Sequence, residues 1–188
     1  MNLCDQYKLM HEQGAFKGYS LLPHVEDIAK LVKKYDAKTL LDYGCGKGLQ
    51  YTEKRAHDAW GGIMPTLYDP HVEGLNIEPK NKFDGIICTD VLEHVPEDEV
   101  KSVLRKLMAY RREFGFIFIT ICTRPAKKTL PDGRNCHLTI KSKEWWLDTI
   151  FRCATDEEGW EHKDGDIYFM CVTGRQDCCE RWYVKFVE

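Results

Sequence analysis

The fold of this chain is decided by one stretch near its start, Leu40-Leu41-Asp42-Tyr43-Gly44-Cys45-Gly46-Lys47-Gly48. The apolar residues that open it and the acid that follows are typical of a strand in a buried parallel sheet. The three glycines then allow a tight turn and a close approach of the backbone to a ligand. A helix is expected over 49–60, and its N-terminus would offer free N–H groups. A strand, a glycine loop and a helix in this order are typical of nucleotide-binding α/β folds.

Segments with the apolar spacing of helices alternate with segments typical of strands on both sides of this stretch. This order indicates an α/β fold with a mostly parallel sheet. Helices are expected over 3–12, 23–34, 96–112 and 143–151, with Arg111, Arg112 and Gly115 closing the third. Strands are expected over 39–43, 64–68, 83–89 and 116–121. The late extended runs 166–173 and 181–187 are expected to pair as an antiparallel end of the sheet.

Length and composition set the class of protein. The 188 residues suffice for one hydrophobic core, so we expect a single domain over 1–188, with a helix or lid over 1–22 and the core over 23–188. The net charge of −3 makes a nucleic-acid partner unfavoured. No secretory signal and no apolar run of membrane-spanning length are visible. We therefore expect a cytoplasmic protein with no membrane partner.

Cysteine is unusually common, with nine residues, but no two have the C-x-x-C spacing of a zinc or redox site. Several lie inside apolar runs, which favours reduced, buried thiols and no metal site. A metal site that combines Cys178 and Cys179 with distant histidines is the less favoured alternative.

The spacing around the glycines excludes two common loops. Position 49, where a dinucleotide loop has its third glycine, is Leu49, and Lys47 is followed by Gly48 rather than by the serine or threonine of a P-loop. Asp69 follows Gly48 by 21 residues, near the distance at which an acid meets ribose hydroxyls in doubly wound folds. A nucleoside that carries an amino-acid tail suits this pattern better than NAD or ATP.

Two runs carry a more specific resemblance. The glycine stretch resembles motif I of class I S-adenosylmethionine-dependent methyltransferases. The run Phe83-Asp84-Gly85-Ile86-Ile87-Cys88-Thr89-Asp90-Val91-Leu92-Glu93-His94-Val95-Pro96 resembles the fourth-strand motif of their small-molecule, type 11/12 branch. Together they cover about residues 38–125. The region 123–135 is similar to a bacterial and phage subgroup. The fold implied is a Rossmann-like, doubly wound, three-layer α/β/α sandwich.

The resemblance implies S-adenosylmethionine as cofactor and a set of residues that would bind it: Asp42, Gly44, Cys45, Gly46, Asp69, Pro70, Thr89 and Asp90. The glycines would hold the methionine portion, and Asp42 would orient the loop or the cofactor's ammonium group. Asp69 would accept hydrogen bonds from both ribose hydroxyls. Thr89 and Asp90 would face the methyl group.

One departure from the family lies between Asp69 and Phe83, which only 13 residues separate. A strand–helix crossover alone needs about a dozen residues or more. At least one helix is therefore expected to be missing, and the third strand to be at most a stub over 75–77. The residue that contacts the adenine is not assigned.

The remaining candidates concern the methyl acceptor. A hydroxyl acceptor needs a general base, and His94 and His137 are the candidates. Arg124, Lys128 and Arg134 lie in a basic stretch after the 116–121 strand, which favours a small anionic acceptor. Two other functions stay open: a nucleic-acid methyltransferase, and a non-catalytic regulatory protein that binds S-adenosylmethionine. Neither the oligomeric state nor the methylated atom is predicted.

Overall fold

The structure is a computed structural model that describes residues 1–155, 165–172 and 179–186. Its centre is a six-stranded sheet in the order β2-β1-β3-β4-β5-β6. The strands are β1 (Leu40–Tyr43), β2 (Thr66–Tyr68), β3 (Phe83–Thr89), β4 (Arg111–Cys122), β5 (Gly165–Val172) and β6 (Cys179–Phe186). β2, β1, β3, β4 and β5 run parallel to their neighbours, and β6 pairs antiparallel with β5. The predicted Rossmann-like α/β fold with a mostly parallel sheet is confirmed.

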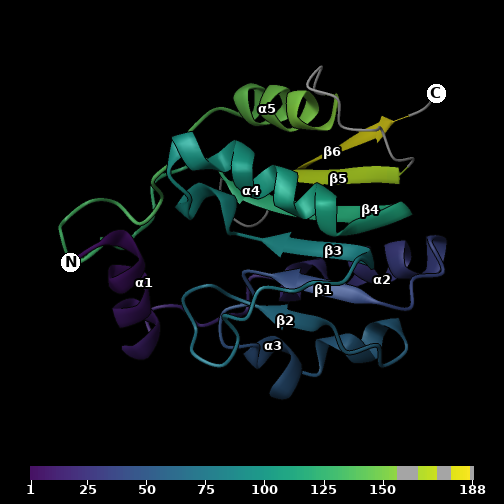
Figure 1. The fold of residues 1–188 in the computed structure, drawn as a ribbon, viewed down its shortest axis with the longest axis horizontal. Coiled ribbons are helices and arrows are strands. Elements are labelled where there is room, and N and C mark those ends of the chain that lie inside the picture. The colour runs from purple at the N-terminus through teal and green to yellow at the C-terminus, as the bar shows by residue number, and fades with distance from the viewer. Residues whose placement is uncertain (156–164, 173–178, 187–188) are drawn as a thin grey trace.

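Helices cover both faces of the sheet (Figure 1). One face carries α4 (Glu97–Tyr110) and α5 (Lys143–Thr155). The other carries α2 (Val25–Lys34), the single turn α3 (Leu49–Thr52), and the 3-10 turns η1 (Leu22–His24) and η2 (Ala56–Trp60). Because side chains alternate along a strand, Ile86 packs under α4 and Ile87 packs under α2. Continuous apolar strands are thereby buried on both faces.

The N-terminal helix α1 (Leu3–Glu12) lies apart from these layers, beyond the carboxyl ends of the strands (Figure 1). Its Tyr7 and Met10 pack against Leu130 and Cys136 of the loop that follows β4. η3 (Leu92–His94) lies in the chain between β3 and α4. Within the segment 1–22, α1 is thus held against the loop after β4 at the carboxyl edge of the sheet.

The shortfall predicted between the second strand and Phe83 is confirmed. Residues 70–82 form neither a helix nor a strand, so even the stub expected over 75–77 is absent. The segment is instead folded back on the end of β2, where the Asp69 N–H donates to the Leu75 carbonyl at 2.9 Å.

Two helix predictions were wrong in their extent. The helix expected over 49–60 is broken, because Arg55 takes a left-handed conformation with φ 50° and separates α3 from η2. The helix after Pro96 ends at Tyr110, so Arg111 and Arg112 open β4 instead of closing the helix. Gly115 is not a helix stop either. A Cβ there would lie 2.6 Å from the Asp84 carbonyl oxygen of the neighbouring strand, so a close strand approach requires glycine.

Among the described residues, no helix has both the length and the apolar character needed to cross a membrane.

Candidate functional site

The residues singled out in the sequence meet at the carboxyl edge of the sheet, where the connections from β1 and β3 leave in different directions. In open α/β sheets ligands bind at such a switch point. Gly44, with φ +77°, begins the loop after β1, and a Cβ on it would lie 2.3 Å from Cγ2 of Val91, which follows β3. The two loops are therefore in contact, and only glycine fits between them.

The glycine loop is bonded to the end of β2. The Gly44 and Cys45 N–H groups donate to the Tyr68 carbonyl at 2.7 and 3.2 Å, and the Gly46 N–H donates to Oδ2 of Asp69 at 2.9 Å. Asp69 is 5% exposed, and its Oδ1 accepts the His71 N–H at 2.9 Å. A carboxylate accepts about four hydrogen bonds, so each oxygen of Asp69 keeps a lone pair for a further donor. That arrangement fits a ligand with two neighbouring hydroxyls.

Asp42 is buried beneath the loop, where its Oδ2 accepts the Gln50 amide at 2.7 Å and the Tyr51 hydroxyl at 2.8 Å. These bonds fix the start of α3 against β1, which agrees with a role in orienting the loop. Oδ1 has no hydrogen-bond partner among the described residues. Burial raises the pKa of Asp42 to about 7.

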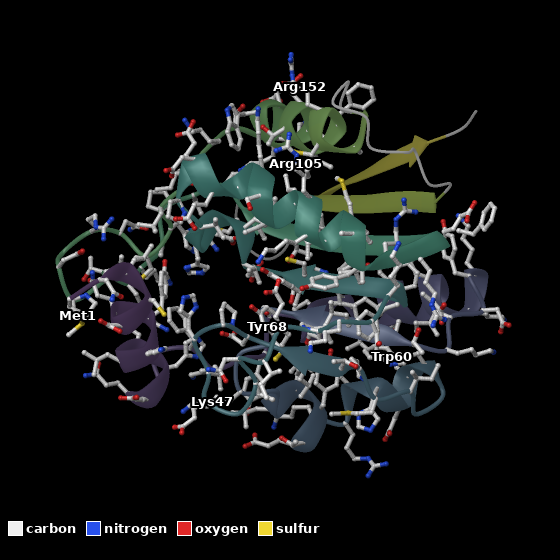
Figure 2. All side chains as sticks on the ribbon, viewed as in Figure 1. Met1, Lys47, Trp60, Tyr68, Arg105 and Arg152 are labelled. Atoms are coloured by element: carbon white, nitrogen blue, oxygen red, sulfur yellow. The ribbon has the colours of Figure 1, made fainter. Side chains whose placement is uncertain are left out.

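The N-terminal segment closes over this edge. A Cβ on Gly46 would have Cε1 of His11 at 3.9 Å and the Gly18 backbone at 3.6 Å. Ser20 Oγ lies 3.1 Å from Oγ1 of Thr89 and donates to the Thr89 carbonyl at 3.2 Å. Lys47 of the loop lies beside α1 in Figure 2, on the side to which β3 points. The edge is therefore covered by the chain's own N-terminus.

Hydrogen bonds join α1 to the loop after β4. The Tyr7 hydroxyl donates to the carbonyls of Cys136 at 2.7 Å and of His94 at 3.1 Å. Gln6 Nε2 donates to Oδ2 of Asp132 at 2.9 Å, and Gln6 Oε1 accepts the Asp132 N–H at 3.1 Å. The Gln6–Asp132 and Tyr7–Cys136 contacts span 126 and 129 residues of sequence, so the cover formed by α1 is built in the tertiary structure.

The two histidines expected as candidate bases lie together. The rings of His94 and His137 are 4.8 Å apart and meet edge to face. Nδ1 of His94 lies 2.9 Å from the Cys136 carbonyl, and Nδ1 of His137 lies 2.6 Å from the Arg124 carbonyl. A carbonyl can only accept, so each Nδ1 carries the proton and each Nε2 keeps a lone pair. Burial lowers the pKa of His137 and lowers that of His94 to about 4.

Asp90 follows β3 in a left-handed conformation with φ 55°, and its Oδ1 accepts the Thr120 hydroxyl at 3.0 Å. Asp90 is exposed at its surface but closely surrounded by protein, and these surroundings raise its pKa against the lowering effects of the Thr120 hydroxyl, His137 and Arg124. Asp90 therefore lies close enough to His137 and Arg124 for their charges to act on it. Pro70 follows Asp69 and is half-buried.

The three basic residues expected to bind the acceptor differ in whether their side chains already have a partner within the chain. Arg134 forms an ion pair with Asp132 at 2.7 Å, and Lys128 lies over the Phe16 ring at 5.2 Å and contacts the Ala15 carbonyl. Arg124 is exposed beside Asp90 and His137, and no ion pair to it is recorded within the described part of the chain. Of these three basic side chains, Arg124 is thus the one with no ion pair or ring contact in the described part of the chain.

Sequence reasoning missed several residues here. His11 and His71, which have no motif, join a ring cluster with Tyr7 and Phe16, at centroid distances of 5.2 Å for Tyr7–His71 and 4.9 Å for His11–Phe16. Glu93 is fully buried, with Oε1 accepting the Cys122 N–H at 2.8 Å. The sequence did offer one signal for Glu93, because it is an acid that closely follows a buried strand and lies next to the candidate base His94.

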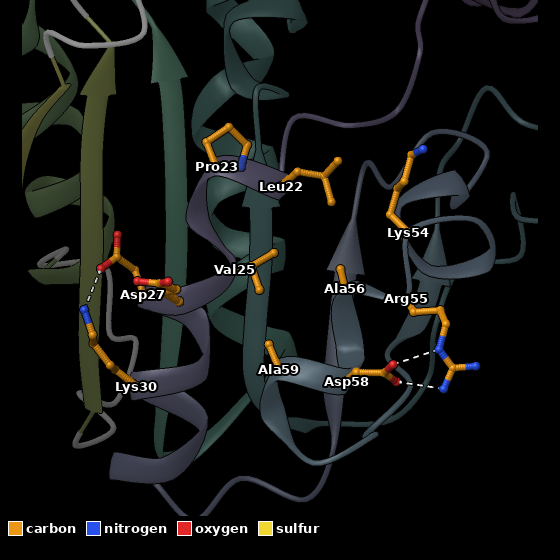
Figure 3. Close-up of a pocket in the computed structure, with 11 residues that line it drawn as sticks. Leu22, Pro23, Val25, Asp27, Lys30, Lys54, Arg55, Ala56, Asp58 and Ala59 are labelled. Atoms are coloured by element: carbon orange, nitrogen blue, oxygen red, sulfur yellow. Dashed lines mark hydrogen bonds and ion pairs between the residues drawn. The ribbon is translucent and has the colours of Figure 1, made fainter.

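A separate groove of about 760 Å³ lies on one face of the sheet (Figure 3). It is lined by α2 and η2, among them Val25, Lys30 and Ala59, while Asp27 and Asp58 are engaged with Lys30 and Arg55. None of the residues expected to bind cofactor or acceptor lines it. We therefore place the candidate site at the carboxyl edge of the sheet and not in this groove.

A family model described as a methyltransferase domain matches residues 19–160. The chain belongs to this methyltransferase family. Relatives include the ubiquinone biosynthesis O-methyltransferases of Bordetella avium, 27% identical over 126 residues, and of Chromobacterium violaceum, 29% identical over 113 residues. The first match covers 56% of this chain and 52% of the relative, and the second covers 50% and 48%. This chain thus spans about half the length of the curated relatives it matches. No solved structure gives a significant match.

Membership assigns residues 19–160 to a methyltransferase domain. The resemblance read from the glycine stretch and the Phe83–Pro96 run is confirmed at the level of the family. The matched region begins after α1 and includes the glycine loop, β3, β4 and α5. The roles of individual residues stay predictions.

Proposed function

We propose that this methyltransferase uses S-adenosylmethionine to methylate a hydroxyl group on a small anionic acceptor. The observation that carries the proposal is the gathering of Asp69, Asp90 and His94 at one edge of the sheet, with the exposed Arg124 beside them. The relatives are named as O-methyltransferases, which supports oxygen as the methylated atom here.

The residues present fit the cofactor. Asp69 retains one lone pair on each carboxylate oxygen, which suits the two ribose hydroxyls. Gly44, Cys45 and Gly46 form the turn that would border its methionine portion, and Asp42 holds that turn from below through Gln50. When bound, S-adenosylmethionine supplies a methyl group on a positively charged sulfur, which is an electrophile.

His94 is the base that we assign. Its Nδ1–H is held by the Cys136 carbonyl, which orients the ring and leaves Nε2 free to accept the acceptor's hydroxyl proton. Nε2 of His94 would take the proton that the acceptor's oxygen loses when the bound S-adenosylmethionine supplies its methyl group. α1, which Tyr7 bonds to the Cys136 carbonyl, would limit the access of water to the two reactants.

Arg124 is the residue that we assign to the acceptor's negative charge. A guanidinium binds carboxylate or phosphate groups in a bidentate manner. Lys128 and Arg134 are already engaged within the chain, so their part in acceptor binding is secondary. Suitable acceptors are therefore small hydroxylated carboxylates and phosphates.

The first experiment is calorimetry of the purified chain with S-adenosylmethionine. We expect saturable binding of one molecule, and no binding by a folded chain would refute both the enzyme and the regulatory function. The second measures S-adenosylhomocysteine formation against hydroxylated carboxylates, sugar phosphates, nucleotides and RNA. Turnover only with RNA would favour the nucleic-acid methyltransferase. Binding without turnover on any acceptor would favour a regulatory protein.

Arg124→Glu tests the anionic acceptor. We expect the acceptor KM to rise about tenfold or more, the loss of about 1.4 kcal/mol, with the affinity for S-adenosylmethionine unchanged. Arg152→Glu is the matched control, because Arg152 is exposed on α5 and pairs with Asp148. An acceptor KM that Arg124→Glu leaves unchanged would remove Arg124 from the acceptor site.

A further inference from the structure

Three side chains that the sequence does not group lie together at the carboxyl edge of the sheet. They are Glu93 from η3, Cys122 from the end of β4 and His137 from the loop that follows. One potential ligand atom from each lies within 4.8 Å of the other two. The set mixes a carboxylate, a thiol and an imidazole, which is a combination that zinc sites use.

Glu93 is the unusual member of this cluster. Its side chain is fully buried, and Oε1 is bonded to the Cys122 N–H at 2.8 Å. Oε2 is also buried, but it has no hydrogen-bond partner among the residues that the structure describes. A buried carboxyl oxygen without a partner has lost its hydration and gained no hydrogen bond in return, which is unfavourable. Glu93 thereby brings a buried carboxylate to a thiol and an imidazole.

The other two side chains are oriented by the backbone. The Arg124 carbonyl accepts Nδ1–H of His137 at 2.6 Å and lies 3.8 Å from the sulfur of Cys122. A carbonyl that holds one ring nitrogen of a histidine is the usual support of a metal ligand, because it leaves the other nitrogen unprotonated. Glu93 has the same kind of support from the Cys122 N–H.

We propose that Glu93, Cys122 and His137 bind one zinc ion. Zinc–ligand bonds of about 2.0–2.3 Å require the three ligand atoms to approach to less than about 4 Å, a movement of about an ångström from their present spacing. Thiolate and imidazole ligands favour zinc over magnesium or calcium, which prefer oxygen alone.

The local charges agree with a divalent cation. With the metal bound, the Glu93 carboxylate, the Cys122 thiolate and the nearby Asp90 carboxylate each carry one negative charge. The zinc ion and the Arg124 guanidinium together carry three positive charges, so the cluster is neutral.

Three protein ligands leave a fourth zinc position for water or substrate, as in catalytic zinc sites. Its location beside Asp90 and His94 places that position at the expected methyl-acceptor end. If the proposed function holds, on which this step rests, the zinc would bind the acceptor's hydroxyl oxygen and ease removal of its proton to His94. The binding of zinc itself does not depend on that function.

The direct experiment is calorimetry of the chelator-treated full chain with Zn²⁺, followed by absorption spectroscopy with Co²⁺. We expect one Zn²⁺ per chain, proton release on binding, and a thiolate-to-cobalt charge-transfer band. Cys122→Ser should remove that band and weaken Zn²⁺ binding about 100-fold or more, because the soft ligand is lost. Glu93→Gln and His137→Asn should each weaken it about tenfold or more.

Cys4→Ser is the matched control, because Cys4 is an exposed thiol on α1 that does not belong to the cluster. It should keep the charge-transfer band and the Zn²⁺ affinity of the unaltered chain. Circular dichroism of each metal-free variant verifies the fold. Zn²⁺ should raise the melting temperature of the unaltered chain and of Cys4→Ser but not of Cys122→Ser.

Absence of Zn²⁺ binding at micromolar concentrations would overturn the proposal. Equal affinity in Cys122→Ser and the unaltered chain would do so as well, since the bound metal would then lie elsewhere. In that case Glu93 serves only to hold the Cys122 N–H. Calorimetry of the metal-free chain with S-adenosylmethionine separates the two proposals, because the cofactor residues Asp69 and Gly46 do not belong to the zinc cluster.

Discussion

The Gly46 N–H donates a 2.9 Å hydrogen bond to Oδ2 of Asp69, so the glycine loop after β1 is fastened to the acid that ends β2. The two residues are 23 positions apart in the chain, and the parallel pairing of β1 with β2 brings them together. The same carboxylate accepts a hydrogen bond from the loop and is expected to accept hydrogen bonds from the ribose hydroxyls. Loop geometry and cofactor affinity are therefore coupled through one side chain.

Asp69→Asn should weaken S-adenosylmethionine binding about tenfold or more. The amide has one accepting oxygen, so it cannot hold the Gly46 N–H and two ribose hydroxyls together, and hydrogen bonds to a charged acceptor are worth about 1.5–3 kcal/mol. Calorimetry measures the affinity. Asp58→Asn is the control, because Asp58 pairs with Arg55 on the surface, and it should leave the affinity unchanged. An unaltered affinity in Asp69→Asn would exclude Asp69 from the cofactor site.

Gly44→Ala should destabilise the protein by about 2–5 kcal/mol. A residue with a Cβ pays about 1–2 kcal/mol for the left-handed conformation, and contact with Val91 adds about 1–3 kcal/mol of overpacking. Gly61→Ala is the matched control, because Gly61 has φ +79° but nothing within 4 Å of the added Cβ. Urea unfolding should show a smaller loss for Gly61→Ala. Adding Val91→Ala to Gly44→Ala should recover part of the difference.

Asp42 should make stability fall as the pH rises. Its pKa is about 7 in the folded chain and near 4 when unfolded, so above pH 4 the unfolded chain loses a proton that the folded chain retains. The contribution of the protonated form is therefore complete below about pH 4 and lost as the pH rises through 7. Asp42→Asn lacks this dependence. Urea unfolding should show that the free energy of unfolding of Asp42→Asn, relative to that of the unaltered chain, rises by about 2 kcal/mol between pH 5 and pH 8. If the difference in free energy of unfolding between the two proteins were the same at pH 5 and pH 8, Asp42 would be ionised in the folded chain throughout this range.

Tyr7→Phe should loosen the cover formed by α1. The variant keeps the ring but loses the bonds to the Cys136 and His94 carbonyls, at a cost of about 1–3 kcal/mol. Amide hydrogen exchange in α1 should quicken about tenfold, with exchange in α4 unchanged. Tyr35→Phe is the control, since the hydroxyl of Tyr35 accepts an exposed bond from Lys34. Equal exchange in both variants would mean that ring packing alone holds α1.

Much of the fold could be predicted from local pattern. The limits of β3 coincide with the predicted 83–89. A short run that is apolar on both faces is typical of a strand in the middle of a parallel sheet, where both faces are covered. Arg111 was misplaced because a basic residue near a helix end is the usual stop signal. In the structure it starts β4, whose close approach to the Asp84 carbonyl uses the nearby Gly115. This contact joins two strands, so the spacing of apolar residues along one segment of the chain cannot predict it.

The fold class and the missing elements between Asp69 and Phe83 could be predicted from hydrophobic periodicity and chain length. The methyltransferase family is recognised from the motifs of the glycine stretch and the Phe83–Pro96 run, and the family model that matches residues 19–160 confirms it. Only the tertiary structure decided which distant side chains share the edge of the sheet. Glu93, Cys122 and His137 meet there because parallel strands bring their carboxyl ends to one place, and Tyr7 reaches Cys136 because α1 folds across it. The candidate zinc site and the cover are therefore properties of the folded chain.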